Sequence, residues 1–197
     1  VTSNDFGNTW NVNNITGTIE NWKCVAVSNN GEYQVIVSEG NSSTKNGMLY
    51  MSNNFGNTWI KKIDGGLNTL FQCVNVSSCG QYQSYGTNNN IYTSNDYGTN
   101  WSAKNINVYT TSISISSTGQ FQSVSTNTNN LYISNDYGNT FTQKENIRNW
   151  KKISISSTGK YQCACAYQNS YIYLSTDYGE TWISVSPTNS QENWNGI

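Results

Sequence analysis

Hydrophobic and polar positions alternate with a period of two along most of this chain, rather than with the 3.6-residue period of a helix. One recurring run places branched residues two apart, as Val25 and Val27, Val74 and Val76, Ile113 and Ile115, and Ile153 and Ile155. A tight turn follows each pair (SNNG, SSCG, SSTG and SSTG), and a second alternating run follows each turn (EYQVIV, QYQSYG, QFQSVS and KYQCAC). This pattern predicts short β-strands joined by turns, so we expect an all-β fold.

A polar octet recurs five times, at intervals of about 40 to 49 residues. Its copies begin at Ser3, Ser52, Ser94, Ser134 and Ser175 and read SNDFGNTW, SNNFGNTW, SNDYGTNW, SNDYGNTF and STDYGETW. A third strand, such as MLYMS or YIYLS, precedes each of the last four octets, and a fourth strand leaves every octet at its final aromatic residue. A period near 40 residues with four strands per repeat is typical of a β-propeller blade.

Residue size identifies the innermost strand of each predicted blade. Between the branched residues of the first strand the side chains are small, as with Cys24 and Ala26 or Ser112 and Ser114. Blades crowd together where they meet the central axis, so small residues are expected there. The first strand of each repeat is therefore predicted to line the axis.

The octet resembles the Asp-box, or BNR repeat, of β-propellers, whose pattern is S-x-D-x-G-x-T-W. Sialidases, sortilin-type receptors, some glucan hydrolases and photosystem assembly factors carry this repeat, and five copies cover nearly the whole chain. The resemblance implies a β-propeller of four-stranded antiparallel blades. Two octets depart from the pattern: Asn54 replaces the aspartate in the second, and the third has Thr99 followed by Asn100.

We expect the octet residues to be structural. The acidic or amide side chain is expected to accept backbone N–H bonds within its own turn, the glycine to supply a positive φ, and the aromatic residue to pack between sheets. An asparagine keeps the acceptor oxygen but loses the charge, so its presence at position 54 favours a structural role over a catalytic one. The predicted structural set is Asp5, Gly7, Trp10, Asn54, Gly56, Trp59, Asp96, Gly98, Trp101, Asp136, Gly138, Phe141, Asp177, Gly179 and Trp182.

The two ends of the chain carry parts of one further repeat. Residues 1–3 resemble the end of a third strand, and the terminal ENWNGI repeats the opening of ENWKCVAV. We therefore expect a single propeller domain over residues 1–197, with four complete blades and a fifth built from both termini, because joining the termini removes exposed strand edges. The alternative is a fragment of a larger propeller, whose open blade edges would pair between chains in a homo-oligomer.

The composition excludes several classes of partner. Ten Lys and Arg balance eleven Asp and Glu without a basic cluster, so we expect no nucleic-acid partner. No stretch is long and apolar enough for a membrane span. Five cysteines are expected to be mostly small buried residues, and with no histidine and one or two carboxylates per octet we predict neither a metal site nor a cofactor.

The residues do not support an enzyme. A sialidase mechanism needs an arginine cluster, and Arg148 is the single arginine, while the lack of histidine excludes the usual nucleophilic triads. A two-carboxylate glycosidase would have to use acids of the links between blades, which are Glu20, Asp64, Glu145 and Glu192. One acid in each of four links is more typical of solvated loops.

The loops between second and third strands are the expected binding face, on the side opposite the octets. They supply neutral amides and tyrosines, which suit the hydroxyls and C–H faces of sugars. The candidate binding residues are Asn41, Asn89, Asn90, Asn129, Asn130, Tyr167, Asn169 and Tyr171. We therefore expect a non-enzymatic binding or scaffold module with glycans as the leading ligand class; the alternatives are a protein-interaction scaffold and a fragment of a glycosidase-type propeller.

Overall fold

Four antiparallel sheets of four strands each make up the fold, with the strands of each sheet paired in chain order. The structure is a computed structural model, and it describes residues 1–3, 5, 7–12, 15, 20–40, 46–66, 68–127, 129–167, 171–186 and 194–197. No helix occurs in these residues, so none of them forms a helix that could cross a membrane. The predicted all-β fold is confirmed.

The strand bounds follow the sequence repeat. Blade 1 contains β1 (Trp22–Val27), β2 (Gln34–Ser38), β3 (Met48–Ser52) and β4 (Ile60–Asp64). Blade 2 contains β5 (Phe71–Val76), β6 (Gln83–Thr87), β7 (Ile91–Ser94) and β8 (Ser102–Ala103). Blade 3 contains β9 (Thr110–Ile115), β10 (Gln122–Thr126), β11 (Asn129–Ser134) and β12 (Thr142–Arg148). Blade 4 contains β13 (Trp150–Ile155), β14 (Gln162–Ala166), β15 (Ile172–Ser175) and β16 (Ile183–Val185).

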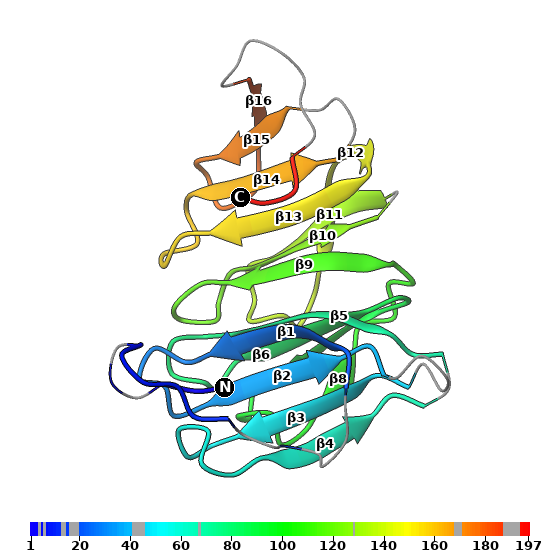
Figure 1. Ribbon diagram of the computed structural model, residues 1–197. Helices are drawn as coiled ribbons and strands as arrows, with labels where there is room; N and C mark the ends of the chain where they lie inside the picture. The colour runs from blue at the N-terminus through cyan, green and yellow to red at the C-terminus, as the bar shows by residue number, and fades with distance from the viewer. Residues whose placement is uncertain are drawn as a thin grey trace.

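The blades fan out from their first strands (Figure 1). Strands β1, β5, β9 and β13 contact one another in succession, and in Figure 1 blade 1 extends downward from this row while blade 4 extends upward. Small side chains allow the close approach: the Asn75 amide donates to the Ile113 carbonyl at 3.2 Å, and the Ser114 hydroxyl accepts from the Ile155 N–H at 3.1 Å. These contacts join neighbouring blades, as the small residues of the first strands predict.

The hydrophobic core is divided among the junctions between blades. The cluster between blades 1 and 2 contains Val35, Leu49, Phe71, Val74 and Tyr85, all buried. Equivalent clusters lie between blades 2 and 3 and between blades 3 and 4. Blades 2 and 3 pack against a neighbour on both faces, and burial of the core therefore depends on the succession of blades.

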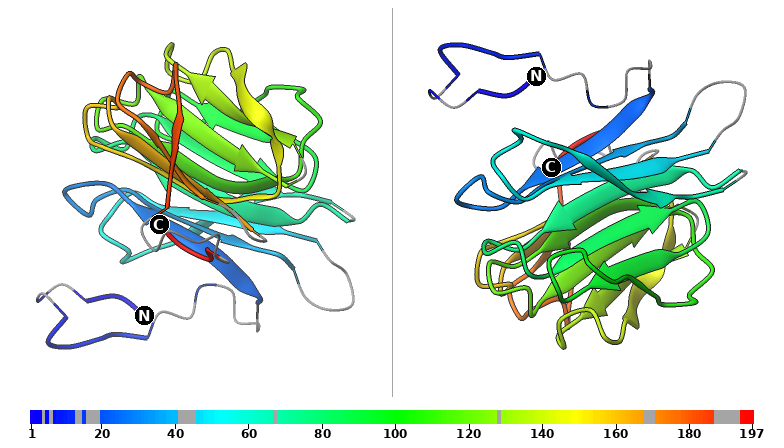
Figure 2. Two further views of the ribbon diagram at one scale, coloured as in Figure 1. Left: turned by 90° about the horizontal axis from the view of Figure 1, so that it is seen from above. Right: turned by 90° about the horizontal axis from the view of Figure 1, so that it is seen from below.

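The two ends of the chain lie outside the four sheets. Residues 1–12 contain a hairpin closed by a bridge between Thr2 and Asn11, and both views of Figure 2 place this hairpin beyond blade 1, on the side away from blade 2. Residues 194–197 lie against blade 4, where Cys165 Sγ is 4.0 Å from the Gly196 carbonyl oxygen. The described terminal residues do not share a sheet, so closure of a fifth blade from both termini stays a prediction.

Candidate binding surfaces

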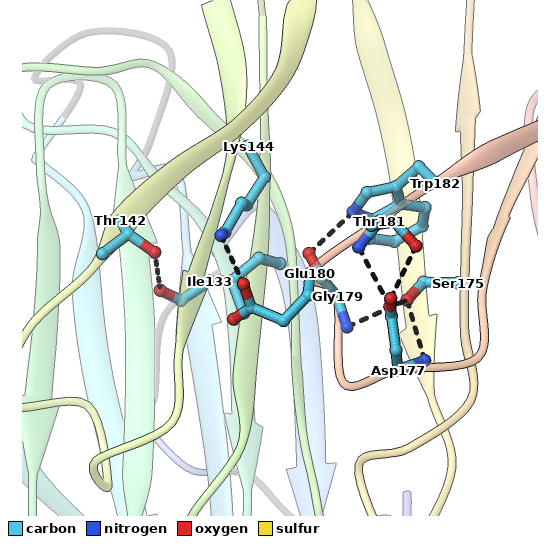
Figure 3. A network of polar contacts seen from close by, with 9 residues as sticks. All are labelled: Ile133, Thr142, Lys144, Ser175, Asp177, Gly179, Glu180, Thr181 and Trp182. Atoms are coloured by element: carbon cyan, nitrogen blue, oxygen red, sulfur yellow. Dashed lines mark hydrogen bonds and ion pairs between the residues drawn. The ribbon is translucent and has the colours of Figure 1, made fainter.

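Each octet forms a tight turn held by its own side chains, and the fifth octet shows the arrangement (Figure 3). The Ser175 hydroxyl donates to Asp177 Oδ1 at 2.8 Å and accepts from the Gly179 N–H at 2.9 Å. Asp177 also accepts the N–H and hydroxyl of Thr181, at 2.9 and 2.5 Å. The Trp182 indole N–H donates to the Gly179 carbonyl at 3.0 Å. The aspartate is therefore the acceptor around which the turn folds.

The second octet keeps this geometry with an amide. The Thr58 N–H donates to Asn54 Oδ1 at 2.9 Å, and the Asn54 amide donates to the Thr58 hydroxyl at 2.7 Å, so the direction of the side-chain bond is reversed. In the third octet Asn100 replaces the threonine and donates its side-chain amide to Asp96 Oδ2 at 2.7 Å. Both departures from the repeat pattern preserve the number of bonds in the turn.

The octet backbone contains a feature that the sequence pattern did not predict. The glycines adopt a positive φ as expected, for example 75° at Gly98. The aromatic residue before each of the last four octet glycines is also left-handed, with φ of 61° at Phe55, 59° at Tyr97, and 64° at Tyr137 and Tyr178. Such values are strained for an aromatic residue. The three tyrosines also pack against rings of the preceding blade, with ring centroids 4.6 to 5.0 Å apart.

Hydrogen bonding keeps the octet carboxylates ionised. Bonds from the Thr181 hydroxyl and N–H and from Ser175 lower the pKa of Asp177 to about 2, and the equivalent bonds from Thr9 and Ser3 lower the pKa of Asp5 to about 2. At Asp96 partial burial opposes the shift, but bonds from the Asn100 N–H and amide still lower the pKa of the carboxyl. A carboxylate with a lowered pKa is a poor proton donor near neutral pH.

Three of the other described acids are paired with lysines. Lys144 Nζ lies 2.7 Å from Glu180 Oε2 (Figure 3), Lys61 lies 3.5 Å from Asp64, and Lys23 forms an ion pair with Glu39. Among the acids of the links, Glu192 lies outside the described residues. The part of the chain that the structure describes contains no group of three or more Cys, Asp or Glu side chains arranged to hold a metal ion.

The cysteines are free thiols in differing environments. Cys73 and Cys165 are buried, Cys24 and Cys163 are half-buried, and Cys79 is exposed. Burial raises the pKa of Cys73 to about 12 and that of Cys163 to about 11. Cys79 departs from the expected burial because it stands in the turn between β5 and β6, where its side chain reaches solvent.

The predicted loop face is brought together only in part. Asn41 and Asn169 lie outside the described residues, and the side chain of Asn129 is likewise outside the description. Two amides serve the fold: Asn90 is buried and accepts the Ile91 and Ile106 N–H groups, and Asn130 donates to the Glu145 carbonyl. The amides of these two asparagines are therefore engaged with the backbone of the fold.

Two of the candidates reach solvent. The Asn89 side chain is exposed, with Oδ1 accepting the Thr87 hydroxyl at 2.7 Å, and Tyr167 is 39 % exposed. Tyr171 is half-buried against the core between blades 3 and 4. Sequence reasoning missed two residues of the loop face. One is Lys151, whose Nζ lies 5.6 Å from the Tyr167 ring centroid. The other is Tyr109, which is exposed and whose carbonyl accepts the Asn127 N–H at the end of β10. The adjacency of Lys151 depends on pairing between β13 and β14, which the pattern alone did not reveal.

Comparison with solved structures identifies the fold. The NkGH74 enzyme from Niastella koreensis matches with a TM-score of 0.69 and 15% identity over 88% of this chain and 31% of that chain. YCF48 from Cyanidioschyzon merolae matches with a TM-score of 0.62 and 14% identity over 86% and 58% of the two chains. A chain of a nidogen/laminin complex matches with a TM-score of 0.62 and 14% identity over 87% and 65%.

This chain thus spans about a third of the NkGH74 chain and less than two thirds of the other two. No family model matches the sequence, and no curated protein matches it. The structural matches, together with the four radiating sheets, show a β-propeller fold. At these levels of identity the likeness concerns the fold alone.

Proposed function

We propose that this chain is a non-enzymatic binding module of the Asp-box type, in which the octets hold the blades and the opposite loop face contacts the ligand. The observation that carries the proposal is the saturation of the octet carboxylates. Asp177 accepts three bonds from its own turn, and the other octet aspartates accept equivalent bonds. The aspartates that recur in the octets therefore serve to hold their own turns.

Carbohydrate is the ligand class that the exposed loop residues suit best. The Tyr167 ring offers an apolar face for stacking against the C–H groups of a sugar, and the Lys151 ammonium beside it can donate to hydroxyls. Asn89 adds an amide on the second-to-third-strand loop of blade 2. The loops of successive blades would provide several weak sites, and binding would gain strength through avidity.

The test is binding of the purified chain to a glycan array, followed by titration of any hit by calorimetry. Tyr167→Ala and Asn89→Ala are expected to weaken binding, because they remove an exposed contact without a core contact. Phe55→Ala is the matched control, since Phe55 is also an exposed aromatic residue but belongs to an octet. Absence of any glycan hit, or equal loss in all three variants, would exclude the loop face as a sugar site.

Two other functions make different predictions. A protein-interaction scaffold is favoured by the exposed apolar side chains at the blade 1 end, among them Trp10, Val25 and Val27; solved propellers of this fold include YCF48 bound to a D1 peptide and a nidogen/laminin complex. A glycosidase-type fragment would cleave members of a glycan panel, and Glu145→Gln would abolish that cleavage. Hydrolysis by the unmodified chain would therefore overturn the non-enzymatic proposal.

A further inference from the structure

The three junctions between successive blades repeat the same contacts. A ring at the start of a second strand stacks on the octet tyrosine of the next blade, in the pairs Tyr33 and Tyr97, Tyr82 and Tyr137, and Phe121 and Tyr178. A turn N–H donates to a turn carbonyl of the next blade at 2.9 to 3.0 Å, from Asn29 to Ser78, from Ser78 to Ser117 and from Ser117 to Ser157. Each blade therefore has two unlike faces: a trailing face that meets the next blade and a leading face that meets the previous one.

Among the described residues no further sheet follows blade 4, so its trailing face carries the junction groups uncovered. Tyr161 stands at the position of the stacked rings and is 57 % exposed. Leu174 is half-exposed, whereas its counterparts Met51 and Ile133 are buried against the next octet. Tyr161 and Leu174 line one hollow of about 320 Å³. Residues 194–197 occupy part of this face, beside Cys165, where the first strand of another blade would begin.

The leading face of blade 1 is open in a complementary way. Val25 and Val27 are 58 % and 51 % exposed, whereas Val74 and Val76, at the same positions of blade 2, are covered by blade 1 and are 3 % and 7 % exposed. The open valines line a cavity of about 720 Å³, and Thr2 and Trp10 of the N-terminal hairpin line it as well. The cavity occupies the place that the first and second strands of a preceding blade would fill.

The N-terminal hairpin already sits as the outer part of such a blade. A Cβ built on Gly56 would lie 3.3 Å from Thr2 Cγ2, and one built on Gly98 would lie 2.2 Å from Met51 Cε. Thr2 and Met51 both precede the serine of an octet, so Thr2 repeats toward blade 1 the contact that Met51 makes toward blade 2. The leading end thus presents a bridged hairpin at the place of third and fourth strands, and the trailing end presents residues 194–197 at the place where a first strand would start.

These two half-blades lie at opposite ends of the fan of blades (Figures 1 and 2). The described terminal residues share no sheet within the chain, whereas the two ends could meet between two chains with every blade junction preserved. We propose that the chain associates head to tail, with the trailing end of one copy, including residues 194–197, docking into the leading-end cavity of a second copy. The contact is heterologous, because the two surfaces that meet are different.

The first measurement is the mass of the 197-residue chain in solution by light scattering across a range of concentrations. The expected result is a concentration-dependent species larger than the 22.0 kDa monomer. Val25→Asp with Val27→Asp should abolish association from the leading end, and Tyr161→Glu with Leu174→Glu should abolish it from the trailing end. Ile147→Asp, at an exposed apolar position on β12, is the control and should leave association intact.

Mixing the two defective variants distinguishes this arrangement from other modes of association. Each retains one intact surface, so an equimolar mixture should form a dimer that contains one copy of each variant and grows no further. Circular dichroism of each variant alone checks that it folds. A chain that is monomeric at every concentration, variants that still associate alone, or a mixture that stays monomeric although both variants are folded would overturn the proposal.

Discussion

The Ser123 hydroxyl donates a hydrogen bond of 2.8 Å to Oε1 of Gln162 and joins the second strands of blades 3 and 4. Ser84 and Gln122 form the same bond at 2.6 Å between blades 2 and 3. At the junction of blades 1 and 2, Val35 stands at the serine position, and Gln83 Oε1 has no hydrogen-bond partner among the described residues. The repeated glutamine therefore joins neighbouring blades at two of the three junctions.

Ser123→Ala is expected to lower the free energy of unfolding by about 1–3 kcal/mol, because it leaves the buried Gln162 Oε1 without its donor. Ser154→Ala changes the same kind of side chain at an exposed position and should alter stability by less than about 0.5 kcal/mol. Urea unfolding of both variants measures the difference. Equal effects of the two substitutions would show that the bond between blades adds nothing.

Val35→Thr should lower the free energy of unfolding by less than Val37→Thr does. Both valines are fully buried on β2, so a new hydroxyl at either position must be desolvated, at about 1–3 kcal/mol without a partner. Position 35 corresponds to Ser84, which donates to a glutamine of the next blade, so the new hydroxyl is expected to reach the unpartnered Gln83 Oε1 and to recover about 1 kcal/mol. Thermal unfolding of the two variants would contradict this assignment if Val35→Thr were the more damaging.

Gly159→Ala should destabilise the junction of blades 3 and 4 more than Gly66→Ala destabilises its loop. Both glycines have positive φ, 81° and 71°, so an alanine at either costs about 1–2 kcal/mol from backbone strain. At Gly159 the added Cβ would also lie 2.4 Å from Cδ2 of the Phe121 ring, whereas at Gly66 it meets no atom within 4 Å. Overpacking adds about 1–3 kcal/mol at Gly159 alone. Comparable losses of stability for the two variants in chemical unfolding would show that the Phe121 ring moves aside at no energetic cost.

Acid is expected to weaken the octet turns only at pH values below the ordinary pKa of an aspartate. The pKa of Asp177 is lowered by hydrogen bonds from 3.8 to about 2, so its stabilising contribution is present above about pH 4 and is lost as the pH falls toward 2. A carbon NMR titration should therefore place the midpoint of the Asp177 carboxyl near 2.

The second octet provides an internal control for this titration. The Thr58 N–H donates to the amide oxygen of Asn54, which does not titrate. The chemical shift of the Thr58 N–H should therefore stay constant over the pH range in which the shift of the Thr181 N–H changes. A carboxyl midpoint near 4 at Asp177 would contradict the bonded geometry of the turn.

The fold and the octet turns follow largely from local sequence. Alternation with period two together with the octets placed the strands of each blade, and the octet pattern anticipated bonds such as that from the Thr181 N–H to Asp177, because these groups lie within a few residues of one another. The left-handed φ of Tyr97, Tyr137 and Tyr178 could not be anticipated in this way, because each ring stacks on a different blade. The repeated Gln122 and Gln162 bond partners that lie 38 and 39 residues away, which local sequence does not reveal.

The candidate binding face depended much more on tertiary structure. Loop composition alone grouped Asn90 with Asn89, yet the backbone turns the first amide inward to bond Ile106 N–H and leaves the second in solvent. The pairing of β13 with β14 likewise places Lys151 beside Tyr167. The sequence by itself determined the repeat, the strands and the turn chemistry, since these depend on neighbours along the chain. Only the stacking of blades decided which side chains are buried, which are paired across junctions, and which remain open at the two ends.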